Sequence, residues 1–230
     1  MDEILKLEQI EYGYFKNGRS IRVIRDACGS FLKGRVYAVI GRVREEKAVL
    51  LSLTAGLVQP CGGRILFDGT DINAFDRDDW RKRNVGLALQ AYKPVPYLTA
   101  LENAALQAEI LGWPAAARKK AAGELLEKLG FDSLKYNWKA SRLSPLEQRK
   151  VALARAAGFK PRLLLVEADG WGDDPELEAR FMNVLTDMAR QDGACVIITS
   201  DSRNLVGMAD EVWGMKDGVL LPLKTLQQPV

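Results

Sequence analysis

The amino-acid sequence predicts an α/β fold in three layers: a parallel sheet between helices, joined by a small antiparallel β subdomain and a helical subdomain. Three observations predict it. Buried-type strands alternate with helices along much of the 230-residue chain, the N-terminal region has a hairpin pattern, and residues 92–158 are rich in Ala, Leu, Lys and Glu at helical spacing. We expect one domain over residues 1–230, with its core and β subdomain in 1–90 and 159–230 and its helical subdomain in 91–158.

The N-terminal region predicts a small antiparallel sheet. Residues 4–10 alternate between apolar and polar side chains, as a half-buried strand does. Asn17-Gly18 suits a type I′ turn and leads to a second strand around residues 21–24. The sequence RILFDGTDI, which follows Gly62-Gly63, indicates a further strand and an Asp-Gly turn.

The remaining elements alternate in a way that predicts a parallel sheet with helices on both of its faces. Buried strands are expected at 36–40, 162–166 and 195–200, and helices at 47–56, 99–111, 114–129, 143–158 and 175–191.

Composition narrows the class of protein. A hydrophobic content of 47% and a charged content of 27% are ordinary for a soluble globular protein. The net charge of +3 is too small to indicate a nucleic-acid partner. No apolar run approaches the roughly 20 residues of a membrane span, and the N-terminal MDEILKLEQ does not have the pattern of a signal peptide.

The residue types also exclude whole classes of chemistry. The chain contains no histidine, which excludes Ser-His and Cys-His nucleophile pairs and histidine metal sites. Its three cysteines, Cys28, Cys61 and Cys195, are far apart and odd in number, which favours reduced thiols in a cytosolic protein.

The stretch after the first buried strand has half of a phosphate-binding motif. The layout is strand, tight loop (Gly41–Glu46) and helix opening at Lys47, and the usual motif is G-x-x-x-x-G-K-[ST]. Gly41 and Lys47 stand at the spacing of that motif, which indicates a P-loop NTPase-like core. Glu46 replaces the second glycine, and Ala48 replaces the hydroxyl residue that would ligate Mg²⁺. An ordinary strand–turn–helix that never bound phosphate remains open as the alternative.

Two glutamates change the electrostatics of this loop. Glu45 and Glu46 bring negative charge to the place where a triphosphate would lie. A non-glycine residue held at positive φ costs about 1–2 kcal/mol, whereas a carboxylate at a helix N-terminus is favoured by roughly 0.3–1 kcal/mol. Our hypothesis is that Glu45 or Glu46 caps the helix and occupies the vacated phosphate site.

With these elements placed, the chain resembles the nucleotide-binding subunit of an ATP-binding cassette (ABC) transporter, of the lipoprotein-releasing and macrolide-exporter type. The stretches that carry the resemblance span nearly the whole chain: LSLTAGL, PCGGRILFDGTDI, NVGLALQ, YLTALENAAL, LLEKLGF, LSPLEQRKVALARA, PRLLLVEADG, DDPELEARF and ADEVWGMKDG. The resemblance implies ATP and Mg²⁺ as ligands, a second nucleotide-binding subunit, and an integral membrane permease as partner at the inner face of the cell membrane.

The resemblance also implies roles for individual positions. Tyr14 matches the aromatic residue that stacks on adenine, and Gln90 matches the glutamine that senses the metal and the γ-phosphate. The family signature LSGGQ or LSGGE is Leu143-Ser144-Pro145-Leu146-Glu147 here. Ser144 and Glu147 form a capping box with Pro at the first helical position, but Pro145 offers no N–H and Leu146 crowds the space that glycine leaves for phosphate.

The catalytic positions of the family are replaced. Glu167 stands for the aspartate that holds Mg²⁺ and Ala168 for the catalytic glutamate. Alanine can do no acid–base work, a loss of roughly 10²–10⁴ in rate where such a group acts. Asp169 is not expected to substitute, because neighbours along an extended segment point to opposite sides. Ser200 stands where the family has a histidine.

These substitutions predict a pseudo-ATPase that docks on a membrane permease, with no catalytic residue and no metal ligand set. The vestigial nucleotide-binding residues are expected to be Tyr14, Gly41, Lys47, Ala48, Gln90, Ser144, Glu147 and Glu167, and the docking residues Tyr92, Pro94, Pro96 and Tyr97. ATP and Mg²⁺ are family ligands that the substitutions argue against here. Two alternatives stay open: a working ATP-hydrolysing subunit, and the impaired half of a heterodimer with a competent cassette. A soluble regulator or nucleic-acid binder ranks below both.

Overall fold

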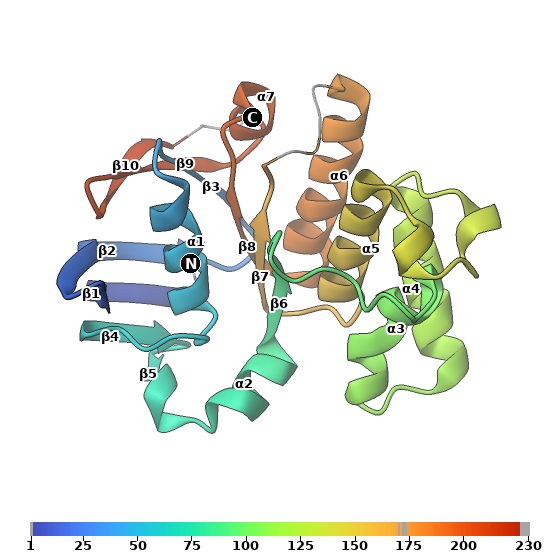
Figure 1. The fold of residues 1–230 in the computed structure, drawn as a ribbon, viewed down its shortest axis with the longest axis horizontal. Coiled ribbons are helices and arrows are strands. Elements are labelled where there is room, and N and C mark those ends of the chain that lie inside the picture. Colours follow the sequence, from blue (N-terminus) through green and yellow to red (C-terminus); the bar gives the residue numbers. More distant parts are fainter. Residues whose placement is uncertain (1, 170, 172–173, 226–230) are drawn as a thin grey trace.

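The fold consists of two sheets, with helices packed chiefly on one side of the larger sheet (Figure 1). The computed structural model describes residues 2–169, 171 and 174–225. The helices are α1 (Arg44–Thr54), α2 (Arg77–Asn84), α3 (Ala100–Ile110), α4 (Ala115–Lys128), α5 (Pro145–Ala157), α6 (Pro175–Asp192) and α7 (Arg203–Gly207). Short 3₁₀ turns lie at η1 (Ile72–Ala74), η2 (Ser133–Lys135) and η3 (Ala140–Arg142).

The smaller sheet is antiparallel throughout, as the sequence predicts. Its strands are β1 (Glu3–Lys16), β2 (Arg19–Leu32), β4 (Gly62–Phe67) and β5 (Thr70–Asp71), in the spatial order β2-β1-β4-β5. Asn17 and Gly18 have φ values of 50° and 73° between β1 and β2. Two positive φ angles in a two-residue loop are the requirement of a type I′ turn, so this prediction is confirmed.

The larger sheet is parallel except at one edge. Its strands are β3 (Val36–Ile40), β6 (Val85–Ala88), β7 (Leu163–Glu167), β8 (Cys195–Thr199), β9 (Glu211–Lys216) and β10 (Val219–Thr225), in the order β10-β9-β3-β8-β7-β6. Only β10 is antiparallel to its neighbour. Because β3, β8 and β7 are parallel neighbours, their carboxyl ends meet at one edge, and the loops that follow them lie together there.

Side-chain alternation along β7 divides the core in two. Leu164 and Val166 belong to the cluster under α5 and α6, whereas Leu165 belongs to the cluster that faces α1 and the antiparallel sheet. The prediction of helices on both faces is confirmed, with α1 on one face and α5 and α6 on the other, and α1 shares its face with the smaller sheet. Strands β1, β2 and β4 of that sheet contribute to the same apolar cluster, because the apolar side chains on the inner face of the smaller sheet must also be buried.

Two further observations bear on the class of protein. Within the described residues, no helix has the length and apolar character needed to cross a membrane. Cys28, Cys61 and Cys195 are all free thiols, and Cys195 is buried.

Candidate functional site

The loop after β3 is shorter than the sequence predicts. We expected the helix to open at Lys47, but α1 begins at Arg44, with Val43 as its extended N-cap (φ −94°, ψ 106°). The three residues Arg44, Glu45 and Glu46 lie inside the helix, because Arg and Glu are good helix formers and nothing holds them at positive φ. Only residues 41–43 remain to connect strand and helix, too few for a loop that wraps around a phosphate.

Gly41 and Ala48 flank this shortened loop. A Cβ added to Gly41 would lie 2.7 Å from the carbonyl oxygen of Met215, so packing on β9 is sufficient to require glycine there. Ala48 lies within α1, where its carbonyl accepts a hydrogen bond from the Ser52 hydroxyl at 2.8 Å. Neither residue presents a polar side chain to an anion.

The glutamate hypothesis is wrong. As far as the structure describes the chain, no side chain caps α1. The Tyr14 hydroxyl donates to the Glu45 carboxylate at 2.6 Å, which raises the pKa of Tyr14. Glu46 is buried, accepts a hydrogen bond from the Gly218 amide at 3.1 Å, and has its pKa raised by burial. The Glu45 and Glu46 carboxylates therefore bind the Tyr14 hydroxyl and the Gly218 amide, and not the free amides at the start of α1.

A different carboxylate pairs with the lysine of the half-motif. The Lys47 ammonium, 1% exposed, lies 2.5 Å from Asp201 Oδ1 and 3.7 Å from Asp169 Oδ2. The Asp201 amide also donates to Asp169 Oδ1 at 3.1 Å. Burial raises the pKa of Asp169, and the nearby Lys47 charge opposes that shift. The charge that a phosphate loop directs at its ligand is therefore neutralised from within the chain.

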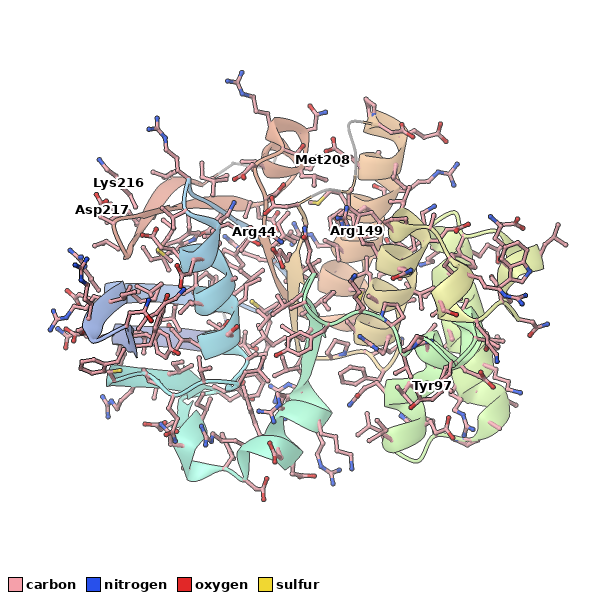
Figure 2. All side chains as sticks on the ribbon, viewed as in Figure 1. Arg44, Tyr97, Arg149, Met208, Lys216 and Asp217 are labelled. Carbon is pink, nitrogen blue, oxygen red and sulfur yellow. The ribbon has the colours of Figure 1, made fainter. Side chains whose placement is uncertain are left out.

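Arg44 occupies the space beside Glu167. Its Nε and Nη2 atoms donate to Glu167 Oε1 at 2.9 and 2.8 Å, and the Gln90 amide donates to Oε2 at 2.9 Å. Arg44 Nη2 also donates to Gln90 Oε1, and Gln90 Nε2 donates to the Asp169 carbonyl at 2.7 Å. In Figure 2 the Arg44 side chain lies where α1 meets the central sheet.

These residues do not fit a magnesium ion. Both oxygens of Glu167 already accept hydrogen bonds, and a guanidinium lies where a cation would bind. Among the residues that the structure describes, no group of three or more His, Cys, Asp or Glu side chains could hold a metal. An open cavity of about 770 Å³ adjoins the cluster. Its lining combines both signs of charge: Arg44, Ala168, Asp169, Trp171, Glu178, Ser200, Asp201, Ser202, Arg203 and Asn204.

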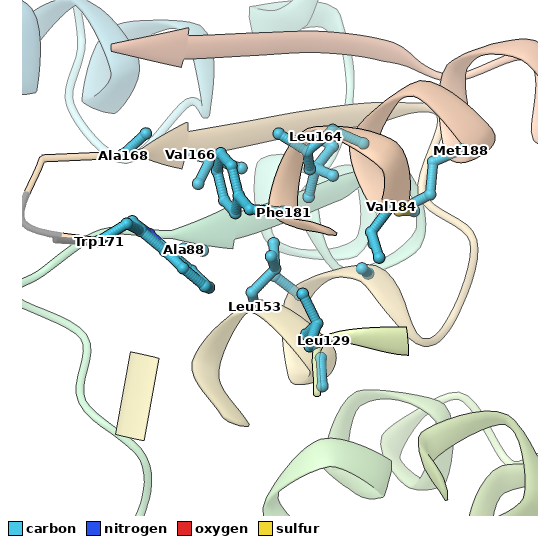
Figure 3. Close-up of a cluster of buried hydrophobic side chains, with 14 of the residues drawn as sticks. Ala88, Leu129, Leu153, Leu164, Val166, Ala168, Trp171, Phe181, Val184 and Met188 are labelled. Carbon is cyan, nitrogen blue, oxygen red and sulfur yellow. The ribbon is translucent and has the colours of Figure 1, made fainter. Parts of the chain in front are cut away.

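Ala168 belongs to the apolar core, although it also lines the cavity. It is 2% exposed, and Figure 3 shows it in the apolar cluster with Val166, Trp171 and Phe181. Neighbouring residues do point to opposite sides, but it is Ala168 that turns inward, so Asp169 shares the Lys47 side with Glu167. The expected opposite orientation of Ala168 and Asp169 is confirmed, and that Asp169 does not substitute for the catalytic glutamate stays a prediction.

Ser200, at the end of β8, is 1% exposed. Its hydroxyl oxygen accepts a hydrogen bond from the Ser202 amide at 3.0 Å. This contact starts the turn into α7. The side chain thus has a structural partner and presents no titratable group to the cavity.

The capping box at α5 is confirmed. The Ser144 amide donates to Glu147 Oε2 at 2.8 Å, the Glu147 amide donates to Ser144 Oγ at 3.3 Å, and Pro145 is the first helical residue. Lys135 also pairs with Glu147 at 2.6 Å. In the described part of the chain, no hydrogen bond or ion pair connects Ser144 or Glu147 to Lys47.

The predicted docking residues differ in exposure. Tyr92 and Tyr97 are 47% and 72% exposed, and Pro96 is exposed. Pro94 is buried, so its assignment to an exposed docking surface is wrong: the loop turns it inward. Tyr92 lines a groove of about 360 Å³ built from α2, β6, α3 and α5, and Tyr97 is not part of that lining.

Sequence reasoning missed Arg44 and Asp201 as site residues. A signal for Asp201 exists: parallel strands end at one edge, so the residues after the strands at 162–166 and 195–200 should meet the start of the helix that carries Lys47. No comparable signal exists for Arg44, because its contact with Glu167 spans 123 positions and depends on where α1 begins.

Comparison with known proteins extends this picture. A family model described as ABC transporter matches residues 25–168. The lipoprotein-releasing system ATP-binding protein LolD of Maricaulis maris is 30% identical and aligns with 96% of this chain and 97% of its own. The uncharacterized ABC transporter ATP-binding protein YclH of Bacillus subtilis is 28% identical, over 90% and 91%. The dimeric structure of MJ0796, a bacterial ABC transporter cassette, matches the fold with a TM-score of 0.90 at 24% identity, over 98% of this chain and 100% of that one.

Proposed function

The chain belongs to the ABC transporter family as an ATP-binding cassette, and we propose that it is a pseudo-ATPase subunit that assembles with a membrane permease without gripping or cleaving ATP. The observation that carries the proposal is two ion pairs within the chain, Lys47–Asp201 and Arg44–Glu167. They lie at the edge of the larger sheet where β3, β7 and β8 end, which we call the nucleotide edge. Asp201 takes the place of a phosphate on Lys47, and Arg44 takes the place of a metal on Glu167.

Charge and space both support this proposal. A bound triphosphate would have to displace Asp201 from a lysine that is 1% exposed. The connection at residues 41–43 offers few backbone amides to replace the lost contacts. Cleavage would then need a base and a metal, and the positions expected to supply them hold Ala168 and an occupied Glu167.

The groove lined by Tyr92 supports the assembly part of the proposal. Its lining includes the apolar side chains of Leu87, Ile110 and Phe159 and the cations Lys82 and Arg155. A groove that combines apolar and charged side chains suits a short amphipathic helix from a partner protein. We place this groove against the permease, and the chain at the cytoplasmic face of the cell membrane, as in the predicted family assembly.

Two other functions remain as competing outcomes. Lys47 and Gln90 are retained, which is what a working ATPase subunit would need. The impaired half of a heterodimer would need a competent cassette as its partner. Both are distinguished from the pseudo-ATPase by nucleotide binding, either to this chain alone or to the mixed pair.

Calorimetry of the purified chain with ATP and Mg²⁺ tests the proposal. We expect no binding with a Kd below about 1 mM, which corresponds to about −4 kcal/mol, and no release of phosphate above background. Lys47→Ala serves as the matched variant, and a hydrolytically active ABC cassette is the positive control. Saturable ATP binding that Lys47→Ala abolishes would overturn the proposal in favour of a working site. Turnover that arises only after a second cassette is added would favour the heterodimer.

A further inference from the structure

We propose that the Arg44 guanidinium is a built-in cation that replaces a divalent metal at Glu167 and holds the Gln90–Tyr92 segment in place without any ligand. Arg44 is then a positioning residue: it acts on the Tyr92 groove through Gln90. All of the contacts that support this role lie within the chain, so the role does not depend on assembly with a permease.

The geometry at Glu167 is that of a closed cation site. Its side chain is 7% exposed, and a buried carboxylate needs a counter-charge or a set of hydrogen-bond donors. Arg44 supplies two N–H donors to Oε1, at 2.9 and 2.8 Å, and Gln90 supplies its amide to Oε2 at 2.9 Å. A guanidinium in this position excludes a second cation by charge and by volume.

Exposure decides how much this pair contributes. The Arg44 side chain is 62% exposed, and exposed ion pairs contribute little to stability. Glu167 is the opposite case, because removing its partner leaves a buried charge unpaired. The effect of losing Arg44 should therefore appear at Glu167 and its neighbour Gln90, and not as a loss of the whole fold.

The link from Arg44 to the groove runs through a short segment. Gln90 is fixed at its amide by Glu167 and at its side chain by Arg44 and the Asp169 carbonyl. Two residues later, the Tyr92 amide donates to the Leu89 carbonyl at 3.0 Å. At the Tyr92 end of the segment, Arg155 Nη2 donates to the Tyr92 carbonyl at 2.9 Å. Hydrogen bonds thus hold the segment at both Gln90 and Tyr92, and Arg44 donates one of the bonds at Gln90.

Amide hydrogen exchange in residues 89–93, measured by mass spectrometry on the full chain without nucleotide, tests this. Arg44→Ala should exchange about tenfold faster there than the parent, because the Gln90 contacts loosen. Arg44→Lys, which keeps the charge but not the planar fork of donors, should fall between the two.

Two control variants separate the effect of the Arg44 charge from other effects on exchange. Arg42→Ala removes an exposed arginine from the loop just before α1, one for which the described residues show no hydrogen bond or ion pair, and it should exchange like the parent. Arg44→Ala combined with Glu167→Gln should exchange more slowly than Arg44→Ala alone, because no buried charge is then left unpaired. Circular dichroism confirms that each variant is folded. Parent-like exchange in Arg44→Ala, or exchange in Arg44→Lys as fast as in Arg44→Ala, would overturn the proposal.

Discussion

At the scale of single residues, the nucleotide edge is organised by charges that find their partners inside the chain. Lys47 is almost fully buried and pairs with Asp201, whose own side chain is 69% exposed. Arg44 and Glu167 show the reverse arrangement, with an exposed cation on a buried anion. Each pair joins one buried charge to one that water still reaches, so neither leaves two desolvated charges to be offset.

Glu46 is the charged residue whose burial is least compensated. Among the described side chains, its Oε2 atom is one of four buried polar atoms without a hydrogen-bond partner, and its other oxygen accepts only from the Gly218 amide. Burial raises its pKa. The folded state therefore binds the Glu46 proton more tightly than the unfolded chain does, and stability falls as the pH rises above the unfolded pKa of about 4.3.

Glu46→Gln should therefore stabilise the protein in a pH-dependent way. At pH 7 the variant should melt about 2–4 °C above the parent, the shift that about 1 kcal/mol gives in a chain of this size. The difference should shrink as the pH falls through the unfolded pKa of about 4.3 and vanish about one pH unit below it, where the carboxyl is neutral in both states. Thermal unfolding across that range measures it, and Glu124→Gln, at an exposed position of α4, controls for net charge. An equal gain at all pH values would mean that ionisation of Glu46 is not its cause.

At the scale of elements, the signature stretch illustrates how a helix start can survive when its anion site does not. Pro145 lacks an N–H, but the first helical position has no intrahelical use for one. Ser144 and Glu147 satisfy each other's backbone amides. The local sequence therefore specifies the start of α5 independently of any ligand.

Ser144→Ala should lower the free energy of unfolding by about 1 kcal/mol, because the Glu147 amide loses its acceptor at the start of α5. Urea denaturation measures the change, and ATP should make no difference to it. Ser141→Ala, three residues earlier at an exposed position, is the matched control and should be nearly neutral. If both variants unfold alike, the capping box contributes nothing measurable to α5.

At the scale of the whole molecule, the groove lined by Tyr92 and the nucleotide edge are joined by one loop. Gln90 touches the Arg44–Glu167 pair, while Tyr92, two residues on, lines the groove. Figure 2 places Tyr97 beside α3, on the helical side and away from Arg44. Docking in the groove therefore predicts different roles for the two tyrosines, which the sequence alone treated together.

Tyr92→Ala should weaken capture of the cognate permease at least tenfold, as expected when an aromatic residue is removed from the centre of an interface. Tyr97→Ala is the matched variant, an exposed tyrosine of the same loop, and it should have a smaller effect if the partner lies in the groove. Co-purification from membranes, followed by quantitative blotting, gives both values. Undiminished capture with Tyr92→Ala excludes the groove, and a loss confined to Tyr97→Ala moves the contact to the outer loop.

The sequence by itself determined the family, the strands β1 to β4, β7 and β8, the helices α1 and α3 to α6, the I′ turn at Asn17-Gly18 and the capping box at Ser144. All of these depend on contacts between neighbours in the chain or on patterns of apolar residues, which a sequence displays directly. It also showed that Ala168 can do no acid–base chemistry, because that follows from residue type.

Only the tertiary structure decided which charges meet. Lys47 and Asp201 are 154 positions apart, and Arg44 and Glu167 are 123 apart. They come together because β3, β8 and β7 are parallel neighbours and because α1 begins three residues earlier than the motif predicts. A one-turn shift in that helix would have left Glu45 or Glu46 in front of the site, as we first expected. The strength of an ion pair depends on distance and burial, and both are properties of the folded chain.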